Sequence, residues 1–145
     1  MRTFGKRVLS LTLSIFAMPD RPTPGPDQES VWDYPRPPAL EADDRRIRVV
    51  FNDTMIADTT DAFRVLETSH PPVYYLPPDD IAADHLHREK RTTMCEFKGR
   101  AVYYTVRVGD RSATQAAWGY PSPVDRYQAL TDHVAFYASK MDACY

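Results

Sequence analysis

The stretch TTMCEFKGRAVYYTVRVGDRSATQAAWGY, residues 92–120, decides the fold of this chain. Polar and apolar residues alternate in it over three runs, which are Thr92–Phe97, Arg100–Val108 and Ser112–Tyr120. Short glycine-containing links separate these runs, and such links favour tight turns between antiparallel strands. Successive side chains of a strand point to opposite faces. The stretch therefore predicts a three-stranded meander whose central strand turns these residues to the core: Val102, Tyr104, Val106 and Val108.

The same alternation appears nearer the N-terminus. Residues 46–51 alternate polar and apolar side chains, and Asn52-Asp53 is a good two-residue hairpin turn. Met55–Thr59 is expected to return antiparallel to the first run. Shorter strands are expected at Ala62–Thr68, Val73–Leu76 and Val134–Phe136. The proline and aspartate cluster at 77–80 predicts a short helical turn.

One segment carries the signals of a longer helix. Ser122 and Asp125 match a capping box, Pro123 takes the first helical position, and residues at helical spacing continue to Thr131. No alternation of strands and helices occurs along the chain. The sequence therefore predicts a mainly β fold: a small antiparallel domain of seven to eight short strands with one short helix.

Proline divides the chain into three parts. Residues 18–44 hold seven of the 13 prolines, which predicts an extended arm that docks through the apolar residues at 31–34 or is a free leader. Residues 1–17 are basic and apolar, as in a targeting segment, but we prefer the interpretation that translation begins at Met18 and keep targeting as the alternative. Residues 45–145 are expected to form a single β domain.

Composition speaks against several classes of protein. A formal charge of −2 disfavours a nucleic-acid binder, and two cysteines are too few for a disulfide framework or a four-thiolate zinc site. His85 and His87 lack an evident third metal ligand. The apolar run at 8–18 is too short to span a bilayer. We expect a cytoplasmic protein without metal or cofactor, while targeting by residues 1–17 and a homodimer stay open.

Two sets of residues are candidates for catalysis. Glu67 and His70 could form an acid–base pair, although both could equally serve the backbone of their own loop. Cys95 could act as a nucleophile if a cation such as Lys98 lies beside it, or it could pack as a small apolar group. No glycine pattern of the common nucleotide-binding loops occurs.

The many aromatic residues indicate either a large core or a ligand pocket. Tyrosine and tryptophan rings with polar groups, close to charged side chains, are typical of pockets for small amphipathic molecules. The residues expected to line such a pocket are Glu67, Tyr75, Cys95, Lys98, Tyr103 and Trp118.

Four blocks of the sequence together resemble one family. They are ESVWDYPRPP at 29–38, LETSHPPVYY at 66–75, CEFKGR at 95–100 and AAWGYP at 116–121. In this order they resemble the domain-of-unknown-function 427 family over about residues 29–145. The resemblance implies a small β fold grouped with the β-tent domains.

The resemblance does not bring every property of these domains. Many β-tent relatives carry paired zinc-binding Cys-x-x-Cys motifs, whereas this chain has only Cys95 and Cys144. The family also travels under a nucleotidyltransferase label, but the Gly-Ser loop followed by metal-binding aspartates is absent here. Many members extend by one further strand beyond the position of Tyr145. Because that loop and those aspartates are absent, the nucleotidyltransferase label is a weak guide to function.

Three functions remain as expectations. The leading one is binding of a small polar or aromatic metabolite, with Lys98 on an anionic group, Glu67 on a donor and the rings as walls. The first alternative is an enzyme that uses Cys95, or Glu67 with His70. The second is an interaction module that presents the proline-rich arm to an aromatic groove of a partner.

Overall fold

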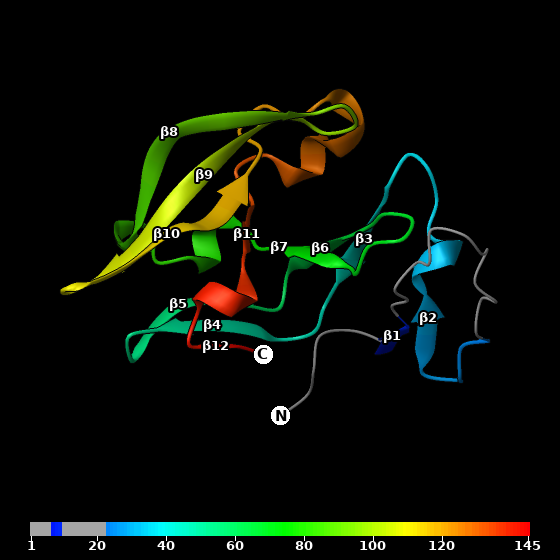
Figure 1. Cartoon of the computed structure of the whole chain (residues 1–145), viewed down its shortest axis with the longest axis horizontal. Helices are drawn as coiled ribbons and strands as arrows, with labels where there is room; N and C mark the ends of the chain where they lie inside the picture. The colour runs from blue at the N-terminus through cyan, green and yellow to red at the C-terminus, as the bar shows by residue number, and fades with distance from the viewer. Residues whose placement is uncertain (1–6, 10–22) are drawn as a thin grey trace, which may run out of the picture.

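The meander predicted from residues 92–120 forms three strands of a four-stranded antiparallel sheet (Figure 1). The structure is a computed structural model that describes residues 7–9 and 23–145. The order in this sheet is β11-β10-β9-β8. Its strands are β8 (Leu86–Cys95), β9 (Gly99–Val108), β10 (Arg111–Gly119) and β11 (Val134–Phe136). Strand β8 begins six residues earlier than the predicted Thr92.

Two three-stranded antiparallel sheets complete the β structure, with the orders β12-β4-β5 and β3-β6-β7. The first contains β4 (Ile47–Phe51), β5 (Thr54–Thr59) and β12 (Ala143–Cys144). The second contains β3 (Ala39–Asp43), β6 (Ala62–Leu66) and β7 (Val73–Tyr75). Asn52 and Asp53 both have positive φ, at 50° and 59°, which confirms the predicted two-residue turn. The mainly β, antiparallel prediction is confirmed.

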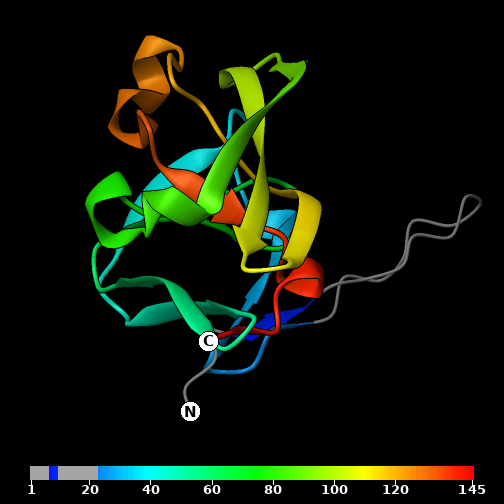
Figure 2. The same ribbon diagram turned by 90° about the vertical axis from the view of Figure 1, so that its left-hand side faces the viewer.

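Backbone hydrogen bonds join the sheets to one another. Leu76, just after β7, exchanges bonds of 2.8 and 2.9 Å with Val134 of β11. The amide of Ala82, in the segment between β7 and β8, donates to the carbonyl of Ile56 in β5 at 2.8 Å and so ties that segment to the sheet of β5. Figures 1 and 2 both show the β4–β5 hairpin at the opposite end of the molecule from the segment that follows β10. The space between these ends holds the core.

The core divides into two main clusters of buried side chains. The first core cluster, between the β4–β5 hairpin and the middle of the molecule, includes Ile47, Val49, Phe51, Ile56, Leu76 and Val106. The second core cluster contains Val65, Tyr75, Ala101, Tyr120, Tyr127, Leu130 and Ala135. Three of its seven members are tyrosines, so this half of the interior carries hydroxyl groups that need partners.

The predicted core face of β9 is only partly correct. Val102 and Val106 are buried, but Tyr104 and Val108 are only half-buried, and Ala101 and Thr105 of the opposite face are buried too. The cause is a register irregularity on each side of β9, between Arg88 and Thr92 in β8 and between Ala113 and Ala117 in β10. Such bulges bend and twist a strand, so each end of β9 meets a different core cluster.

The helix predicted after Ser122 is present, but it is shorter than predicted and is a 3₁₀ helix. Residues Asp125–Leu130 form η4, a 3₁₀ helix with a kink at Tyr127. Its N-cap is Val124, which has no side-chain capping bond, so the capping box predicted from Ser122 and Asp125 does not form. The segment is held by packing, because Tyr127 and Leu130 are both buried in the second core cluster. Shorter 3₁₀ turns are η2 (Pro78–Asp80), η3 (Ala83–His85) and η5 (Ala138–Lys140); η2 confirms the helical turn predicted there.

Much of the proline-rich segment packs on the domain. Strand β2 (Gln28–Ser30) pairs in parallel with β1 (Arg7–Leu9) and leads into η1 (Val31–Asp33). Val31 and Tyr34 are buried against Leu66 at the end of β6. Strand β3, also within the predicted arm, pairs with β6 in the sheet. Residues 1–6 and 10–22, which hold most of the predicted leader and the start of the arm, lie outside the described residues.

Candidate functional site

A cluster of four aromatic side chains lies where the four-stranded sheet meets β7. We call Tyr75, Tyr103, Trp118 and Tyr120 the aromatic cluster. Trp118 of β10 donates its indole N–H to the Tyr75 hydroxyl at 3.2 Å, and their rings meet edge to face. The ring of Tyr120 lies 6.1 Å from that of Tyr75. Offset and edge contacts of this kind are the favoured geometry for aromatic pairs, so the rings hold one another in place.

Tyr103 extends the cluster along β9. It is the cross-strand neighbour of Trp118, and its hydroxyl is 2.8 Å from the Thr93 hydroxyl of β8. The guanidinium of Arg91 lies 5.1 Å from the Tyr103 ring centre. On the other side, Tyr137 lies 4.4 Å from Trp118 and is 40% exposed. The cluster therefore runs from the buried Tyr75 to the surface.

Burial raises the pKa values of the two inner phenols, Tyr75 and Tyr120. Tyr75 is buried, and burial raises its pKa above the usual range of a tyrosine. Burial likewise raises the pKa of Tyr120, and the neighbouring Tyr75 adds to the effect. An ordinary tyrosine is already protonated at neutral pH, and the upward shift extends this to more alkaline pH, so both hydroxyls can donate hydrogen bonds. This matters for binding, because a neutral phenol does not repel an anion.

Lys98 is the buried cation next to the aromatic cluster. It lies between β8 and β9, is only 6% exposed, and its ammonium nitrogen is 5.9 Å from the Tyr120 ring centre. Its backbone carbonyl accepts a hydrogen bond from Val124 at 3.0 Å, which fixes the turn. Among the described residues, the ammonium group has no carboxylate partner and no hydrogen bond. A lysine in this position is free to meet an anion.

Glu67 brings a negative charge to the same region. It follows β6, and its charge is one of the smaller contributions, after burial, that raise the pKa of Tyr75 and of Tyr127. Within the part of the chain that the structure describes, its carboxylate forms no ion pair, either with Lys98 or with another cation. The cluster is therefore flanked by two opposite charges that do not neutralise each other.

Cys95 lies at the end of β8 and packs on the second core cluster, together with Tyr103 and Trp118. It is a free, half-buried thiol. The five residues other than Tyr75 that were expected to line a pocket thus lie near Tyr75 or Tyr120, although this proximity does not test the pocket itself. Tyr120 and Tyr137 were not among them, although the density of tyrosines after β10 was a signal for both.

His70 is placed differently from the acid–base hypothesis. Its ring nitrogen Nδ1 is 2.9 Å from the carbonyl oxygen of Thr68, and the imidazole is exposed. The contact with Glu67 is made by the backbone instead, since the amide of His70 donates to the Glu67 carbonyl at 3.0 Å. The two residues therefore share a turn, and their side chains form no hydrogen bond among the described contacts.

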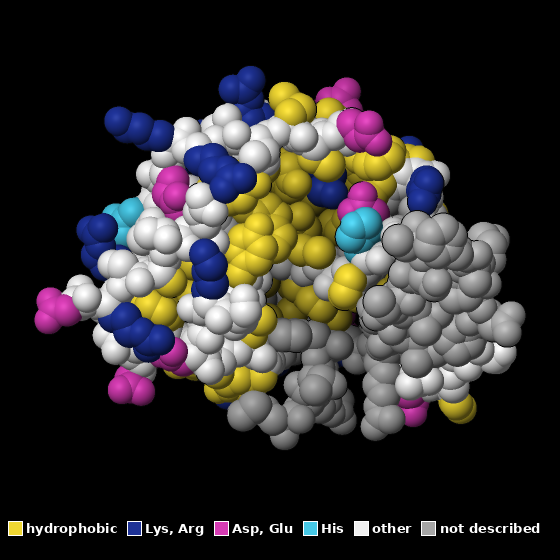
Figure 3. Space-filling model, viewed as in Figure 1, with side chains coloured by type: hydrophobic (Ala, Val, Ile, Leu, Met, Phe, Trp, Pro, Cys, Tyr) yellow, Lys and Arg dark blue, Asp and Glu magenta, His cyan; other side chains and the backbone are white. Residues whose placement is uncertain are grey.

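The molecular surface is hollowed in this region. Figure 3, in the orientation of Figure 1, shows a concave area lined mainly by hydrophobic side chains between the sheet of β9 and β10 and the loop that follows β6. A basic side chain lies inside it, and acidic and histidine side chains stand at its rim. We call this area the hollow. A hydrophobic floor with few charged groups is the usual composition of a small-molecule site.

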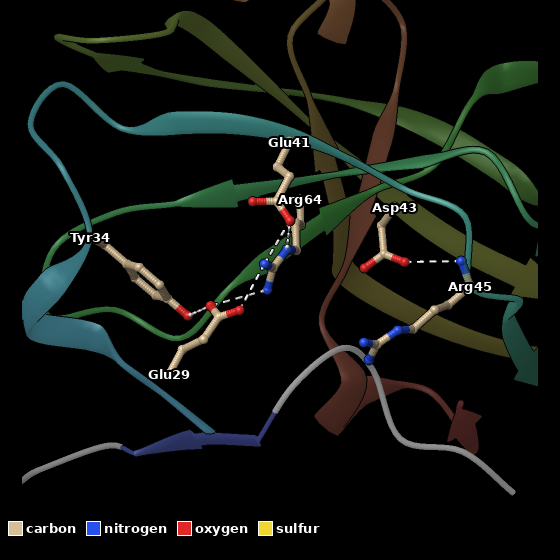
Figure 4. Close-up of polar contacts among 6 residues, drawn as sticks. All are labelled: Glu29, Tyr34, Glu41, Asp43, Arg45 and Arg64. Atoms are coloured by element: carbon tan, nitrogen blue, oxygen red, sulfur yellow. Dashed lines mark hydrogen bonds and ion pairs between the residues drawn. The ribbon is translucent and has the colours of Figure 1, made fainter. Parts of the chain in front are cut away.

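A separate cluster of charges around the buried Arg64 fixes the arm to the domain (Figure 4). Arg64 of β6, which is 5% exposed, bonds Glu29 of β2 at 2.9 Å and Glu41 of β3 at 2.7 Å. The Tyr34 hydroxyl donates to Glu29 at 2.8 Å. Burial, and then this neighbouring carboxylate, raise the pKa of Tyr34. Every charge in this cluster has a partner, so its role is to hold the arm; Asp43 and Arg45 beside it make a local turn contact of 2.9 Å.

The structure offers no evident metal centre among the described residues, because no three metal-ligating side chains of histidine, cysteine, aspartate or glutamate converge. His85 is in η3 and its ring contacts the carbonyl of Arg107 at 3.1 Å, while His87 is in β8. None of the helices in the described ranges has the length and apolar character required to span a bilayer.

Comparison with known proteins yields one family. A family model described as "Domain of unknown function (DUF427)" matches residues 39–145. The match begins at β3, ten residues later than the resemblance seen in the sequence, and so includes the whole aromatic cluster with Glu67 and Lys98. No curated protein shows a significant match to the chain.

Proposed function

The chain belongs to the DUF427 family, whose description assigns no activity, and we propose from the site itself that it binds a small aromatic anion in the hollow. In this proposal Lys98 meets the anionic group and the aromatic cluster meets the ring. Glu67 accepts a hydrogen bond from a donor elsewhere on the ligand. The protein is then a binding module for a small metabolite.

The unpaired ammonium of Lys98 carries the proposal. Removing a charged group from water costs several kcal/mol unless a partner compensates for it. Lys98 as a whole is only 6% exposed, and the Tyr120 ring is a weak substitute for an anion. Among the described residues, the Lys98 ammonium nitrogen is not one of the fully enclosed side-chain nitrogens without a hydrogen-bond partner. It therefore still reaches the open space beside it. A carboxylate or similar group in that space would complete its coordination.

The rings favour an aromatic ligand over an aliphatic one. Trp118 lies between Tyr75 inside and Tyr137 outside, at centroid distances of 6.2 and 4.4 Å. A planar ligand can add one further edge or offset contact to this series, each worth about 0.5–1.5 kcal/mol beyond the buried area. Two hydrogen bonds, from Trp118 to Tyr75 and between Tyr103 and Thr93, fix the rings before binding. This lowers the entropy that is lost on association.

A thermal-shift screen tests this proposal. The set of compounds should contain aromatic carboxylates, their neutral amides and matching aromatic amines. We expect only the carboxylates to raise the unfolding midpoint, because only they carry the negative charge that Lys98 would meet. A ligand present at 100 times its Kd stabilises the folded state by about 2.7 kcal/mol. That corresponds to a shift of several degrees for a chain of this size.

Matched variants separate the site from general effects. Lys98→Met should abolish the shift, whereas Lys90→Met, which removes an exposed lysine from β8, should leave it unchanged. Glu67→Gln should weaken the binding of only those ligands that carry a hydrogen-bond donor. Equal shifts for amides and carboxylates, or shifts that persist in Lys98→Met, would count against the proposal.

A further inference from the structure

A second concave site lies between the proline-rich segment and η4. It is a groove of about 340 Å³, which we call the proline groove, lined by Pro35, Arg36, Pro37, Pro38, Ala39, Leu40, Arg126 and Tyr127. Lys98, Glu67 and Trp118 do not line it, so it is distinct from the binding site proposed above around Lys98 and the aromatic cluster. Its volume is at the small end of the range of ligand pockets.

The walls of the proline groove are rigid. Three of its lining residues are prolines, whose φ angles are fixed. Tyr127 is buried, and its hydroxyl donates to the carbonyl of Pro38 at 2.7 Å, which ties η4 to the proline-rich segment. The pairing of β3 with β6 begins directly after these prolines, at Ala39. The groove is therefore held in shape from both sides without a ligand.

Two arginines give the proline groove its charge. Arg36 and Arg126 both line it, both are exposed, and no acidic residue lines it. Within residues 7–9 and 23–145, neither guanidinium has an ion pair or a hydrogen bond. Other arginines of the chain are engaged differently: Arg46 pairs with Asp58 at 2.8 Å and Arg111 with Asp142 at 2.6 Å. The proline groove thus concentrates two uncompensated positive charges from segments about 90 positions apart.

We propose that the proline groove binds a small phosphate monoester. The dianionic phosphate lies between Arg36 and Arg126, and the organic group of the ester packs on the prolines and Leu40. Guanidinium groups match phosphate oxygens with pairs of parallel hydrogen bonds, and a dianion balances two charges where a carboxylate balances one. This proposal does not depend on the function assigned to the hollow.

Calorimetric titration with phenyl phosphate tests the proposal. Inorganic phosphate and phenol, which each represent one half of this compound, are titrated for comparison. We expect saturable binding of phenyl phosphate at low ionic strength, weaker binding of inorganic phosphate, and none of phenol. Arg36→Gln and Arg126→Gln should each lower the affinity for phenyl phosphate about ten-fold. This is the effect of losing a charge-assisted contact of about 1.4 kcal/mol. Both arginines are exposed, so both variants should fold, which circular dichroism checks.

Two control variants complete the experiment. Arg88→Gln removes an exposed arginine of β8 and should not change the affinity. Lys98→Met should not change it either, since Lys98 does not line the proline groove. The proposal is overturned if phenyl phosphate does not bind at millimolar concentration, or if its affinity is the same in Arg36→Gln and Arg126→Gln as in the unmodified protein. It is equally overturned if Lys98→Met removes the binding.

Discussion

Cys144 shows how strongly burial acts on a single group in this small domain. It lies on β12, the short strand that pairs with β4, and burial raises the pKa of its thiol to about 11. Only the thiolate reacts with alkylating agents. At pH 8, a thiol with this pKa is ionised to about 0.1%. We expect iodoacetamide to leave Cys144 unmodified in the folded protein and to modify it fully in urea, as measured by peptide mass spectrometry.

The same measurement examines the nucleophile hypothesis, because Cys95 provides the second thiol. Rapid alkylation of Cys95 in the folded protein would keep the enzyme alternative, whereas an inert Cys95 would remove its nucleophile. Fast native modification of Cys144 at neutral pH would contradict the burial that we describe for β12.

Lys98 and Arg64 are both buried cations, but the sequence predicted only one of them. Lys98 lies in a short segment rich in aromatic and polar residues, so local composition was enough to select it. Arg64 is paired with Glu41 and Glu29, which are 23 and 35 positions away, and no local pattern announces such contacts. The aromatic cluster was therefore predictable from local composition. Docking of the arm through residues 31–34 was one of the two predicted alternatives, but the ion pairs of Arg64 that hold it were not predictable.

At the level of single elements, the bulges around β9 decide what faces the core. The carboxylate of Glu89 accepts from the Gln115 amide at 2.7 Å and from the Thr105 hydroxyl at 3.1 Å, so one side chain joins both irregular positions. Alternation along a sequence assumes an unbroken ladder, and it fails where residues are inserted. Turn chemistry was more reliable, since Asn52-Asp53 needs only local backbone angles.

Gly119 is the contact point between β10 and β11. A Cβ atom at this position would lie 2.5 Å from the backbone oxygen of His133, so the two strands would have to separate. We expect Gly119→Ala to lower the free energy of unfolding by about 1–3 kcal/mol, the usual cost of overpacking. Urea denaturation measures it. Gly25→Ala is the control, because a Cβ there meets only the end of the Gln28 side chain; equal stability of both variants would contradict the described packing.

Arg64 fixes the proline-rich arm to the sheet. Replacing it with methionine leaves the carboxylate of Glu29 without its buried cation, and breaking a buried pair from one side costs about 3 kcal/mol. We expect Arg64→Met to speed chymotryptic cleavage at Trp32, which lies in the arm. Glu41→Gln serves as control, since Glu41 is half-exposed and its loss should have little effect. An unchanged cleavage rate in Arg64→Met would show that apolar packing of Val31 and Tyr34 alone holds the arm.

The stability of the whole molecule should fall at alkaline pH. Burial raises the pKa values of Tyr75, Tyr120 and Cys144, so the folded state keeps protons that the unfolded chain loses above about pH 8.5 for cysteine and about pH 10 for tyrosine. Stability is then fully present below about pH 8.5 and declines as the pH rises further, because the unfolded state binds fewer protons there.

Urea denaturation across this range measures the decline, and Tyr75→Phe should make it shallower. The ultraviolet absorbance of tyrosinate should report the buried phenols only on unfolding. A free energy of unfolding that is constant or rises to about pH 11 would contradict the burial of these groups.

The class of the fold was predictable, and its assembly was not. Alternating side chains and turns are local, so most strands were recognised from sequence. The joining of sheets depends on contacts such as Leu76 with Val134, which are remote in sequence. The one short helix was predicted in the right place, but its type was not: Ser122 and Asp125 are signals of an α-helix cap, whereas the packing of Tyr127 and Leu130 selects a short 3₁₀ segment.

The most direct test of the central claim, that Lys98 and the aromatic cluster bind an aromatic anion, uses the two tryptophans of the chain. Trp118 belongs to the cluster and Trp32 to the arm, so their indole N–H signals in a nitrogen–proton NMR spectrum report on two separate places. Benzoate, the simplest aromatic carboxylate, should shift the Trp118 signal in a saturable way and leave Trp32 unmoved. The shift should disappear in Lys98→Met and persist in Lys90→Met. A Trp118 signal that does not respond to benzoate, or that responds equally in Lys98→Met, would contradict the claim.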